Sequence, residues 1–427
     1  YGCHESYAKH NEAPVEESIK KVDINPEFIH QNEMYQSSKY NEGILKALRN
    51  NDKIKKILNK YRSEDLGDDW LPTSIYCSEC GKDTIISQSF NDPLLEYECK
   101  CGNKDKVDVN KASNVKLKWR VDWPMRWAHE DVVFEPGGKD HSTQGGSRDT
   151  GKIISEEIYD KKAPVYMMYD FVKIKGGAGK ISSSEGDVIT LNDVLEVYEP
   201  EIVRWIFASK RANTEFSISF DFDVFKVYDD FEKTERIYYD NEGEENEKEK
   251  NKQKAVYELS LLDKIQDKQP IQVPFRHFVT LIQVNEGDVE KTFNHFENKV
   301  VTEFDKKRIK KRIRLAKNWV EKYAPDKVKF KVRDKIPKED KKELKEKVSD
   351  DLKEVYEKIL KELKEEDDDE ELHQFFYETC KEHNVKLGKF FKISYQIILG
   401  KSRGPRLAGF MIDLGHERIK NIFDQIL

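Results

Sequence analysis

Gly176-Gly-Ala-Gly-Lys-Ile-Ser-Ser-Ser184 combines a flexible backbone with one lysine and three hydroxyl groups. Such a loop can grip a polyphosphate, because its ammonium and backbone N–H groups neutralise charge that develops in phosphoryl or adenylyl transfer. It is not a Walker A loop, since Ile174 stands where the first glycine belongs and Ile181 stands where Ser or Thr should follow the lysine. Short Lys/Ser/Gly loops are also common solvated turns, so its neighbours must decide between the two interpretations.

Three stretches before the loop are rich in aromatic and charged residues. They are, in order, Trp119-Arg-Val-Asp-Trp-Pro-Met-Arg-Trp127, Phe134-Glu-Pro-Gly-Gly-Lys-Asp-His141 and Met168-Tyr-Asp-Phe-Val172. With the loop they resemble the class I lysyl-tRNA synthetases of the archaeal type, in which the loop is the counterpart of the KMSKS signature. Further family-like stretches run from Tyr1 to the C-terminus. The resemblance implies an α/β fold: a Rossmann-like catalytic domain with a zinc-ribbon-like insertion, followed by an all-α anticodon-binding domain.

Length and composition limit the possible functions. At 427 residues the chain has room for two or three domains. Charged residues make up 37% of it, against about 25% in an average domain. Lys and Glu contribute together, so the net charge is only −7 and any RNA-binding surface must be a local patch. No apolar run approaches the roughly 20 residues that span a bilayer, so no membrane partner is expected.

Apolar spacing divides the chain. Residues 14–62 have helical spacing, residues 75–109 have short β-like runs around cysteines, and residues 115–175 alternate strand-like pieces with a helix expected over 150–159. We therefore expect four parts. They are the remaining first half of the catalytic domain (1–70), the zinc-binding insertion (71–114), the second half of the catalytic domain with the KMSKS-like loop (115–240), and the helical anticodon-binding domain (256–427).

Most of the second half of the chain has helical spacing. Pro200 is expected to open a helix in which Ile202, Val203, Ile206 and Phe207 are buried. Residues 241–255 have almost nothing to bury and are predicted to be a flexible loop or linker. The acidic run 365–371 predicts an exposed loop or a fraying helix end. The expected helices that follow residue 255 cover 275–284, 289–296, 306–323, 338–363 and 372–382.

Four cysteines are spaced as metal ligands. Cys77 and Cys80 form one pair, Cys99 and Cys101 form the other, and 18 residues separate the pairs. Four thiolates supply a closed tetrahedral site, the usual arrangement of structural zinc, although unligated thiols are the alternative. A glycine follows each pair, where a turn around a metal commonly needs backbone freedom. The expected role is to hold an insertion too small to bury its own core.

Two further cysteine positions are less specific. Cys3, His4 and His10 either form a second metal site or a hydrogen-bonded cluster at a helix start, and the sequence leaves both open. Cys380 is isolated and is predicted to be a core thiol.

The resemblance assigns roles to individual residues. It implies Lys180 as the pyrophosphate clamp, with Ser182 and Ser184 as hydroxyl donors. Ser183 stands where the family often has a second lysine, and Glu185 places an acid beside the phosphate, so both depart from the signature.

The same resemblance assigns the amino-acid pocket. It places Trp119, His141 and Tyr169 at lysine-pocket positions. Asp122, Gly138 and Asp140 complete the expected ATP- and lysine-binding set, and Glu135 lies in the same blocks. The residue-level alternatives are core packing for Trp123 and Trp127, and a simple ion pair between Asp122 and Arg120 or Arg126.

The other class I signature, the His-x-Gly-His tetrapeptide, does not occur in the sequence. Tyr1-Gly-Cys-His-Glu-Ser-Tyr-Ala8 resembles an interior stretch of the family. The resemblance therefore implies that the first strand and helix of the catalytic domain are missing, so that an active full-length parent is expected and this polypeptide should form the adenylate inefficiently.

Two stretches are candidates for RNA contact. Residues 303–317 carry eight Lys/Arg and two acids on one expected helix, which suits phosphate contact or an ordinary solvated face equally well. Gly400-Lys-Ser-Arg-Gly-Pro-Arg406 resembles the end of the helical anticodon-binding domain. Arg403 and Arg406 on this turn are expected to stack on or hydrogen-bond splayed anticodon bases. Phe390, Phe391 and Tyr395 are predicted to be core residues.

The expected function is attachment of lysine to lysine tRNA through a lysyl-adenylate. ATP with Mg²⁺, L-lysine and lysine tRNA are the expected ligands, zinc is the expected structural metal, and a cytoplasmic monomer is expected. The alternatives are a fragment or paralogue that only binds tRNA, and an unrelated zinc-ribbon nucleic-acid-binding protein.

Overall fold

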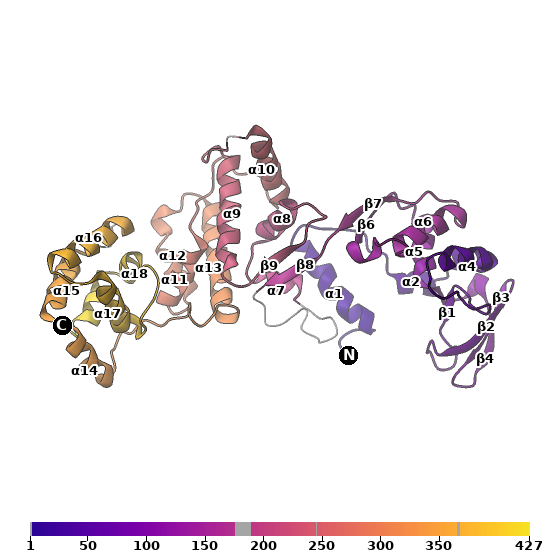
Figure 1. Cartoon of the computed structure of the whole chain (residues 1–427), viewed down its shortest axis with the longest axis horizontal. Coiled ribbons are helices and arrows are strands. Elements are labelled where there is room, and N and C mark those ends of the chain that lie inside the picture. Colours follow the sequence, from indigo (N-terminus) through magenta and orange to yellow (C-terminus); the bar gives the residue numbers. More distant parts are fainter. Residues whose placement is uncertain (1, 176–188, 245, 365–367) are drawn as a thin grey trace. The chain divides into compact units, whose positions relative to one another are not determined.

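The computed structural model describes residues 2–175, 189–244, 246–364 and 368–427 (Figure 1). The three catalytic candidates Lys180, Ser182 and Ser184 lie outside the described residues. None of the described helices is both long and apolar enough to cross a bilayer.

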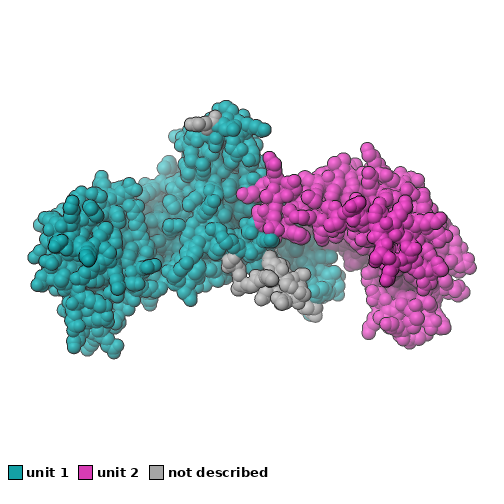
Figure 2. Space-filling view, viewed as in Figure 1, with its two compact units in different colours: residues 1–24, 173–209, 217–427 teal, residues 25–172, 210–216 magenta. Residues whose placement is uncertain are grey.

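The chain divides into two compact units, which are coloured separately in Figure 2. One unit contains residues 25–172 and 210–216, and it is called the zinc unit below. The other contains residues 1–24, 173–209 and 217–427, and it is called the helical unit.

The zinc unit mixes helices and strands. Its elements are α2 (Gln31–Gln36), α3 (Asn41–Arg49), α4 (Asn51–Asn59), β1 (Thr73–Ile75), β2 (Ile85–Asn91), β3 (Leu94–Cys99), β4 (Lys104–Asp108), a 3-10 turn (Val109–Lys111), β5 (Val115–Leu117), α5 (Trp119–His129), β6 (Phe134–Gly138), a 3-10 turn (Lys139–His141), α6 (Ser147–Glu157) and β7 (Val165–Tyr169).

The core of the zinc unit forms as the apolar spacing predicted. The residues that recur on α3 and α4 are all buried and pack in one cluster with the apolar side of the cysteine-bearing strands. The predicted helix over 150–159 is α6, and it connects β6 to β7, which pair in parallel from Phe134 opposite Val165 to Gly138 opposite Tyr169. This strand–helix–strand unit is the part of a Rossmann-like sheet that the sequence predicted.

The insertion is a small antiparallel sheet. Strands β2, β3 and β4 pair in that order, while β1 pairs with β5 at its base, from Thr73 opposite Leu117 to Ile75 opposite Val115. Leu95, Tyr97 and Cys99 are buried on β3, which is too little apolar surface to stabilise three strands alone.

The helical unit is almost entirely α-helical. Its helices are α1 (Tyr7–Lys20), α7 (Leu191–Leu195), α8 (Pro200–Ala208), α9 (Asp223–Tyr238), α10 (Glu247–Ser260), α11 (Phe275–Val284), α12 (Val289–Asn294), a 3-10 turn (Glu297–Lys299), α13 (Glu303–Lys322), α14 (Lys338–Lys347), α15 (Asp350–Glu362), α16 (Asp369–Glu382), α17 (Leu387–Leu399), α18 (Leu407–Leu414) and α19 (His416–Phe423). Strands β8 (Val172–Lys175) and β9 (Phe216–Ser219) pair where the chain passes between the units.

The predicted linker over 241–255 is wrong for most of its length, because residues from Glu247 onward form helix α10. The side chain of Asn246 caps the helix by accepting hydrogen bonds from the backbone N–H groups of Lys248 and Glu249. The apolar residues that hold it, Val256 and Tyr257, lie beyond the window in which the sequence showed nothing to bury. Tertiary packing therefore overrides a polar composition.

Three helix predictions also need correction. On α8, Phe207 is half exposed and Trp205 takes its buried place, since the buried stripe follows 202, 203, 205 and 206. The single helix expected over 338–363 is two helices, and Val348 is the C-cap of the first. Within the acidic run, Asp368 caps α16 and the following acids form its first turn. Their negative charges interact favourably there with the positive end of the helix dipole.

Candidate active site and metal centres

The strongest site candidates meet at one edge of the β6–β7 pair. Gly138 and Tyr169 are register partners at the carboxyl ends of these parallel strands. The 3-10 turn of Asp140 and His141 follows β6 directly. Carboxyl ends of parallel strands are where ligands bind in open α/β sheets. Four residues that lie up to 31 positions apart in the sequence are therefore brought together.

An aromatic wall borders this edge. The Trp119 ring stacks on Trp123 at 5.1 Å and lies 5.8 Å from the His141 ring, centroid to centroid. Trp119 is 45% exposed, whereas Trp123 and Trp127 are buried, so their predicted core role is confirmed. The Trp123 indole N–H donates to Glu135 on β6 at 3.0 Å, which fixes the ring beneath Trp119.

The turn that carries His141 is held by its neighbours. The hydroxyl group of Ser142 donates to the carbonyl oxygen of Gly138 at 3.1 Å and lies 2.8 Å from the Tyr166 hydroxyl. Gly137 permits this arrangement, because a Cβ atom there would lie 2.1 Å from the Tyr166 oxygen. Lys139, on the same turn, forms an ion pair with Asp170 at 3.0 Å.

Asp122 lies on the same helix as Trp119 but is engaged within the protein. One carboxylate oxygen accepts a short hydrogen bond from the Tyr35 hydroxyl, and the other pairs with Arg126 at 3.0 Å. The pair with Arg126 confirms one of the two partners that the sequence allowed. Burial raises the pKa of Asp122, and the charge of Arg126 opposes that rise.

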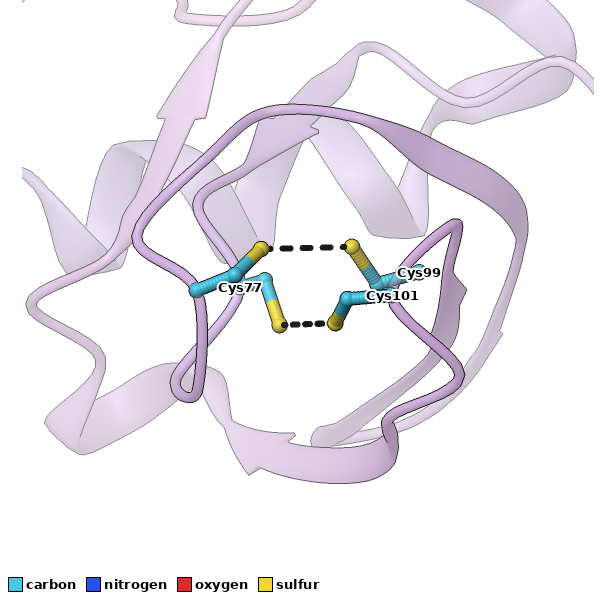
Figure 3. A group of neighbouring side chains, drawn as sticks. Cys77, Cys99 and Cys101 are labelled. Carbon is cyan, nitrogen blue, oxygen red and sulfur yellow. Dashed lines mark hydrogen bonds between the residues drawn. The ribbon is translucent and has the colours of Figure 1, made fainter.

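The four predicted zinc ligands converge (Figure 3). The Sγ atoms of Cys77 and Cys101 are 3.7 Å apart, as are those of Cys80 and Cys99, and all four lie within 4.8 Å of one another. A tetrahedral site with Zn–S bonds of about 2.3 Å has S···S edges of about 3.8 Å. The two 3.7 Å distances match the edges of such a tetrahedron, and the cluster as a whole can hold a metal ion.

Two matching turns hold these sulfur atoms. Cys77 accepts from the Gly81 N–H and Cys99 accepts from the Gly102 N–H, each through its carbonyl oxygen at 2.9 Å. Both glycines have left-handed backbones, with φ of +67° and +92°, as the sequence predicted for turns around a metal. Backbone N–H groups directed at sulfur, first that of Cys80, lower the pKa of Cys77 to about 6. The thiolate is the form that binds zinc.

Comparison with known proteins identifies the family. The model described as "tRNA synthetases class I (K)" matches residues 1–263, which is more than half of the chain. The chain belongs to this family of class I tRNA synthetases. A second model, described as "Anticodon binding domain", matches residues 289–423 of the same class I chain.

Relatives of this class I synthetase cover nearly all of it. A lysine–tRNA ligase from Borreliella burgdorferi is 42% identical over 420 residues, which is 98% of this chain and 79% of that relative. One from Thermococcus kodakarensis is 42% identical over 426 residues, 98% of this chain and 80% of the relative. One from Treponema pallidum is 40% identical over 422 residues, 97% of this chain and 78% of the relative.

The class I synthetase has a second cluster of metal-ligand type. The Sγ atom of Cys3 and the Nδ1 atoms of His4 and His10 form a triangle with 3.2 Å sides. A metal ion and a network of hydrogen bonds both fit this geometry, and the cluster lies at the start of α1.

The anticodon-domain candidates line a hollow of about 580 Å³ in the helical unit. Arg403 and Arg406 form one side, and Arg406 pairs with Asp369 at 3.2 Å. Phe391 lines the hollow and its ring is nearly parallel to that of His373, at 5.7 Å. Phe391 is half-buried, so its predicted core role holds only in part, whereas Phe390 and Tyr395 are buried as predicted.

Several contacts hold the turn that carries the two arginines. The Tyr395 hydroxyl donates a short hydrogen bond to the Pro405 carbonyl oxygen. Gly404 packs against the Tyr395 ring, where a Cβ atom would lie 2.8 Å from the ring carbons. Gly400 ends α17 with a left-handed backbone at φ +68°. Sequence resemblance found the arginines, but stacking of His373 on Phe391 left no local signal.

The basic helix α13 is partly internal. Arg308 pairs with Glu235 at 3.0 Å, and Arg312 pairs with Glu199 at 2.7 Å and with Glu232. Both arginines are buried, so neither can reach a phosphate. The net positive charge of residues 303–317 therefore overstates the charge that the helix presents to solvent. The sequence could not reveal this, since the three glutamates lie on α9 and before α8.

Proposed function

We propose that this chain attaches lysine to lysine tRNA through a lysyl-adenylate, using ATP with Mg²⁺. The observation that carries the proposal is the match of 42% identity to lysine–tRNA ligases over 98% of the chain. We assign the catalytic part to residues 1–70 and 115–240, the zinc insertion to 71–114 and anticodon binding to 256–427.

The lysine pocket is proposed at the edge of β6 and β7. The exposed Trp119 face and Tyr169 provide an aromatic wall for the methylene stem of lysine, whose ammonium group is attracted to ring faces. Asp140 is the anionic acceptor, and its Oδ2 atom lies 3.7 Å from His141 Nε2. Gly138 lets the ligand approach the backbone closely.

Asp122 is proposed to position Arg126 beside the lysine pocket. Because Tyr35 and Arg126 engage its two oxygens, it holds Arg126, whose guanidinium lies 5.6 Å from the Trp119 ring. For the pyrophosphate we propose Lys180 as the charge clamp and Ser182 and Ser184 as hydroxyl donors, on the sequence resemblance alone. ATP with Mg²⁺ supplies the adenylyl group and neutralises its phosphate charge.

Recognition of lysine tRNA is proposed at the hollow beside Arg403 and Arg406. A splayed base can stack on the Phe391–His373 pair, and the guanidinium groups can donate to its carbonyl oxygens. Zinc is proposed as a structural ion on the four cysteines, and the cytoplasm as the compartment, since such a site requires reduced thiols. We propose a monomer.

The direct test is charging of lysine tRNA with labelled lysine and ATP. Charging with lysine and not with arginine is the expected result. A chain that binds lysine tRNA but charges it with no amino acid would favour the non-catalytic alternative. The variant Trp119→Ala should raise KM for lysine, while Trp70→Ala, whose tryptophan lies before β1 and outside the proposed pocket, should leave it unchanged.

A further inference from the structure

Helix α16 places an acidic residue at the border of the hollow beside Arg403 and Arg406. Helices α16 and α18 pack against each other in the helical unit (Figure 1). His373, which lines the hollow, lies one turn after Asp369 on α16, so the two residues share one face of the helix. An acid beside an RNA-binding site needs an explanation, because it repels the phosphates of the ligand.

The Asp369 carboxylate lies at the start of α18. Its Oδ1 atom is 3.2 Å from Nη1 of Arg406, which is the N-cap residue of α18. Its Oδ2 atom lies close to Gly409 in the first turn of that helix, where a Cβ atom would be 3.2 Å from this oxygen. The glycine therefore leaves room for the carboxylate. The start of a helix attracts anions, because its unpaired backbone N–H groups and its dipole are positive there.

The stability of α16 does not explain the charge of Asp369. Asp368 already caps this helix, since its side chain accepts hydrogen bonds from the backbone N–H groups of Glu370 and Glu371. Glu370 and Glu371 already place acids in the first turn, beside the positive end of the helix dipole. Among these four described acids, Asp369 is the one that pairs with Arg406.

The ion pair changes what Arg406 can offer to an RNA. The Arg406 side chain is 51% exposed, so its guanidinium group stays open to a ligand while Asp369 engages one side of it. A carboxylate there occupies the position that a backbone phosphate would take, because both anions accept from the same N–H groups. The remaining N–H groups can donate to a base edge, which carries the sequence information that a phosphate lacks.

We propose that Asp369 makes RNA binding at this hollow selective for the anticodon sequence. Its carboxylate takes the place of an RNA phosphate at the start of α18 and holds the Arg406 guanidinium group for a base edge. Asp369 is a positioning residue, since it acts through Arg406. The inference rests on the proposed function, because it requires that the hollow binds the anticodon of lysine tRNA.

The test compares two fluorescein-labelled RNAs by anisotropy. One is the anticodon stem-loop of lysine tRNA, and the other is the same stem-loop with the anticodon of alanine tRNA. In Asp369→Asn, Arg406 is free to contact a phosphate of either RNA, so binding of the alanine stem-loop should tighten about fivefold. Binding of the lysine stem-loop should change by less than about twofold, because a phosphate contact replaces a base contact.

Two measured quantities therefore change in Asp369→Asn. The ratio of the two dissociation constants should fall about fivefold, since the alanine stem-loop alone gains affinity. For the alanine stem-loop, the slope of log K against log salt concentration should steepen by about 0.7, the value for one further phosphate contact with a single strand. An ion pair that only stabilised the fold would change neither quantity.

Matched variants separate this effect from general repulsion and from loss of folding. Glu370→Gln removes the same charge from the next residue, and Glu378→Gln removes it farther along α16, where Glu378 accepts from Gln374 at 2.9 Å. Both should change the ratio by less than about twofold, because exposed charges interact weakly. In an Arg406→Ala background, Asp369→Asn should no longer change the ratio, since Arg406 carries the effect. Equal Tm values check that each variant is folded.

Charging of lysine tRNA by the wild type separates the inference from the proposed function. If charging occurs but both stem-loops tighten equally in Asp369→Asn, or Glu370→Gln lowers the ratio as much, the inference is overturned and the proposed function stands. If the ratio falls as expected but the wild type charges no tRNA, the inference stands and the proposed function is overturned. If the wild type neither charges lysine tRNA nor binds either stem-loop, both are overturned.

Discussion

Replacing Arg312 with methionine is expected to destabilise the helical unit strongly. Arg312 is 1% exposed, and its guanidinium group pairs with Glu199 and Glu232, whose side chains are 6% and 5% exposed. Methionine fills much of the same volume but leaves two buried carboxylates without a cation. Removing one partner of a buried ion pair costs about 3–5 kcal/mol, because the remaining charge is uncompensated.

The effect should be measured by amide hydrogen exchange. Opening of α9 and α13 should become roughly 100- to 1000-fold faster, which corresponds to the lower part of that energy range. Helices α3 and α4 of the zinc unit serve as the internal reference and should keep their exchange rates. Arg314→Met is the matched control, since Arg314 lies on the same helix and is exposed.

The pH dependence of the free energy of unfolding provides a second, independent test of the role of Arg312. Burial alone would raise the pKa of Glu199, but the charges of Arg312 and Arg308 lower it. Without Arg312, burial raises this pKa above its unfolded value, so the variant loses stability as pH rises through that pKa. The wild type instead loses stability as pH falls through its depressed pKa. The wild type and Arg312→Met should therefore differ less in their free energy of unfolding at about pH 5 than at about pH 7.

Two outcomes would refute this reasoning. Exchange in α13 that changes no more than in Arg314→Met would mean that the buried pairs contribute little. A stability difference between the wild type and Arg312→Met that widens at lower pH would mean that Glu199 is not the unpaired charge. Rescue of Arg312→Met by Glu199→Gln together with Glu232→Gln would support the assignment, since no buried charge would remain.

Three shorter predictions follow from the other sites. Cys99→Ser should release zinc and lower the Tm of the zinc unit, measured by metal analysis and calorimetry, and retention of one zinc per chain would contradict the four-thiolate site. Arg403→Ala should weaken binding of lysine tRNA by about 1–3 kcal/mol in equilibrium titrations, through loss of a base contact, with a smaller loss for Arg406→Ala because Asp369 already pairs with it. Burial raises the pKa of Asp413 to about 7. The protonated carboxyl group therefore makes its whole contribution to the free energy of unfolding below about pH 4, and this contribution is lost as the pH rises through 7. Asp413→Asn should flatten that profile in urea titrations, and an unchanged profile would exclude Asp413 as its source.

Local features were predictable from the sequence. The clustering of the four cysteines, their two glycine turns and helix α6 all follow from spacing over a few residues, because short-range geometry decides where a turn can place two sulfur atoms. Aromatic and polar motifs identified the family, and comparison confirmed it. Where the prediction failed, as at α10, residues outside the local window supplied the packing.

Which side chains face each other was decided only by the tertiary structure. Charge along the sequence did not distinguish Arg312, buried between two glutamates, from Arg314, exposed two residues later on the same helix. Nor did it show that the Trp119 ring lies 5.8 Å from the His141 ring. Such pairings join residues far apart in the chain, and their energy depends on burial, which exists only once the elements have packed.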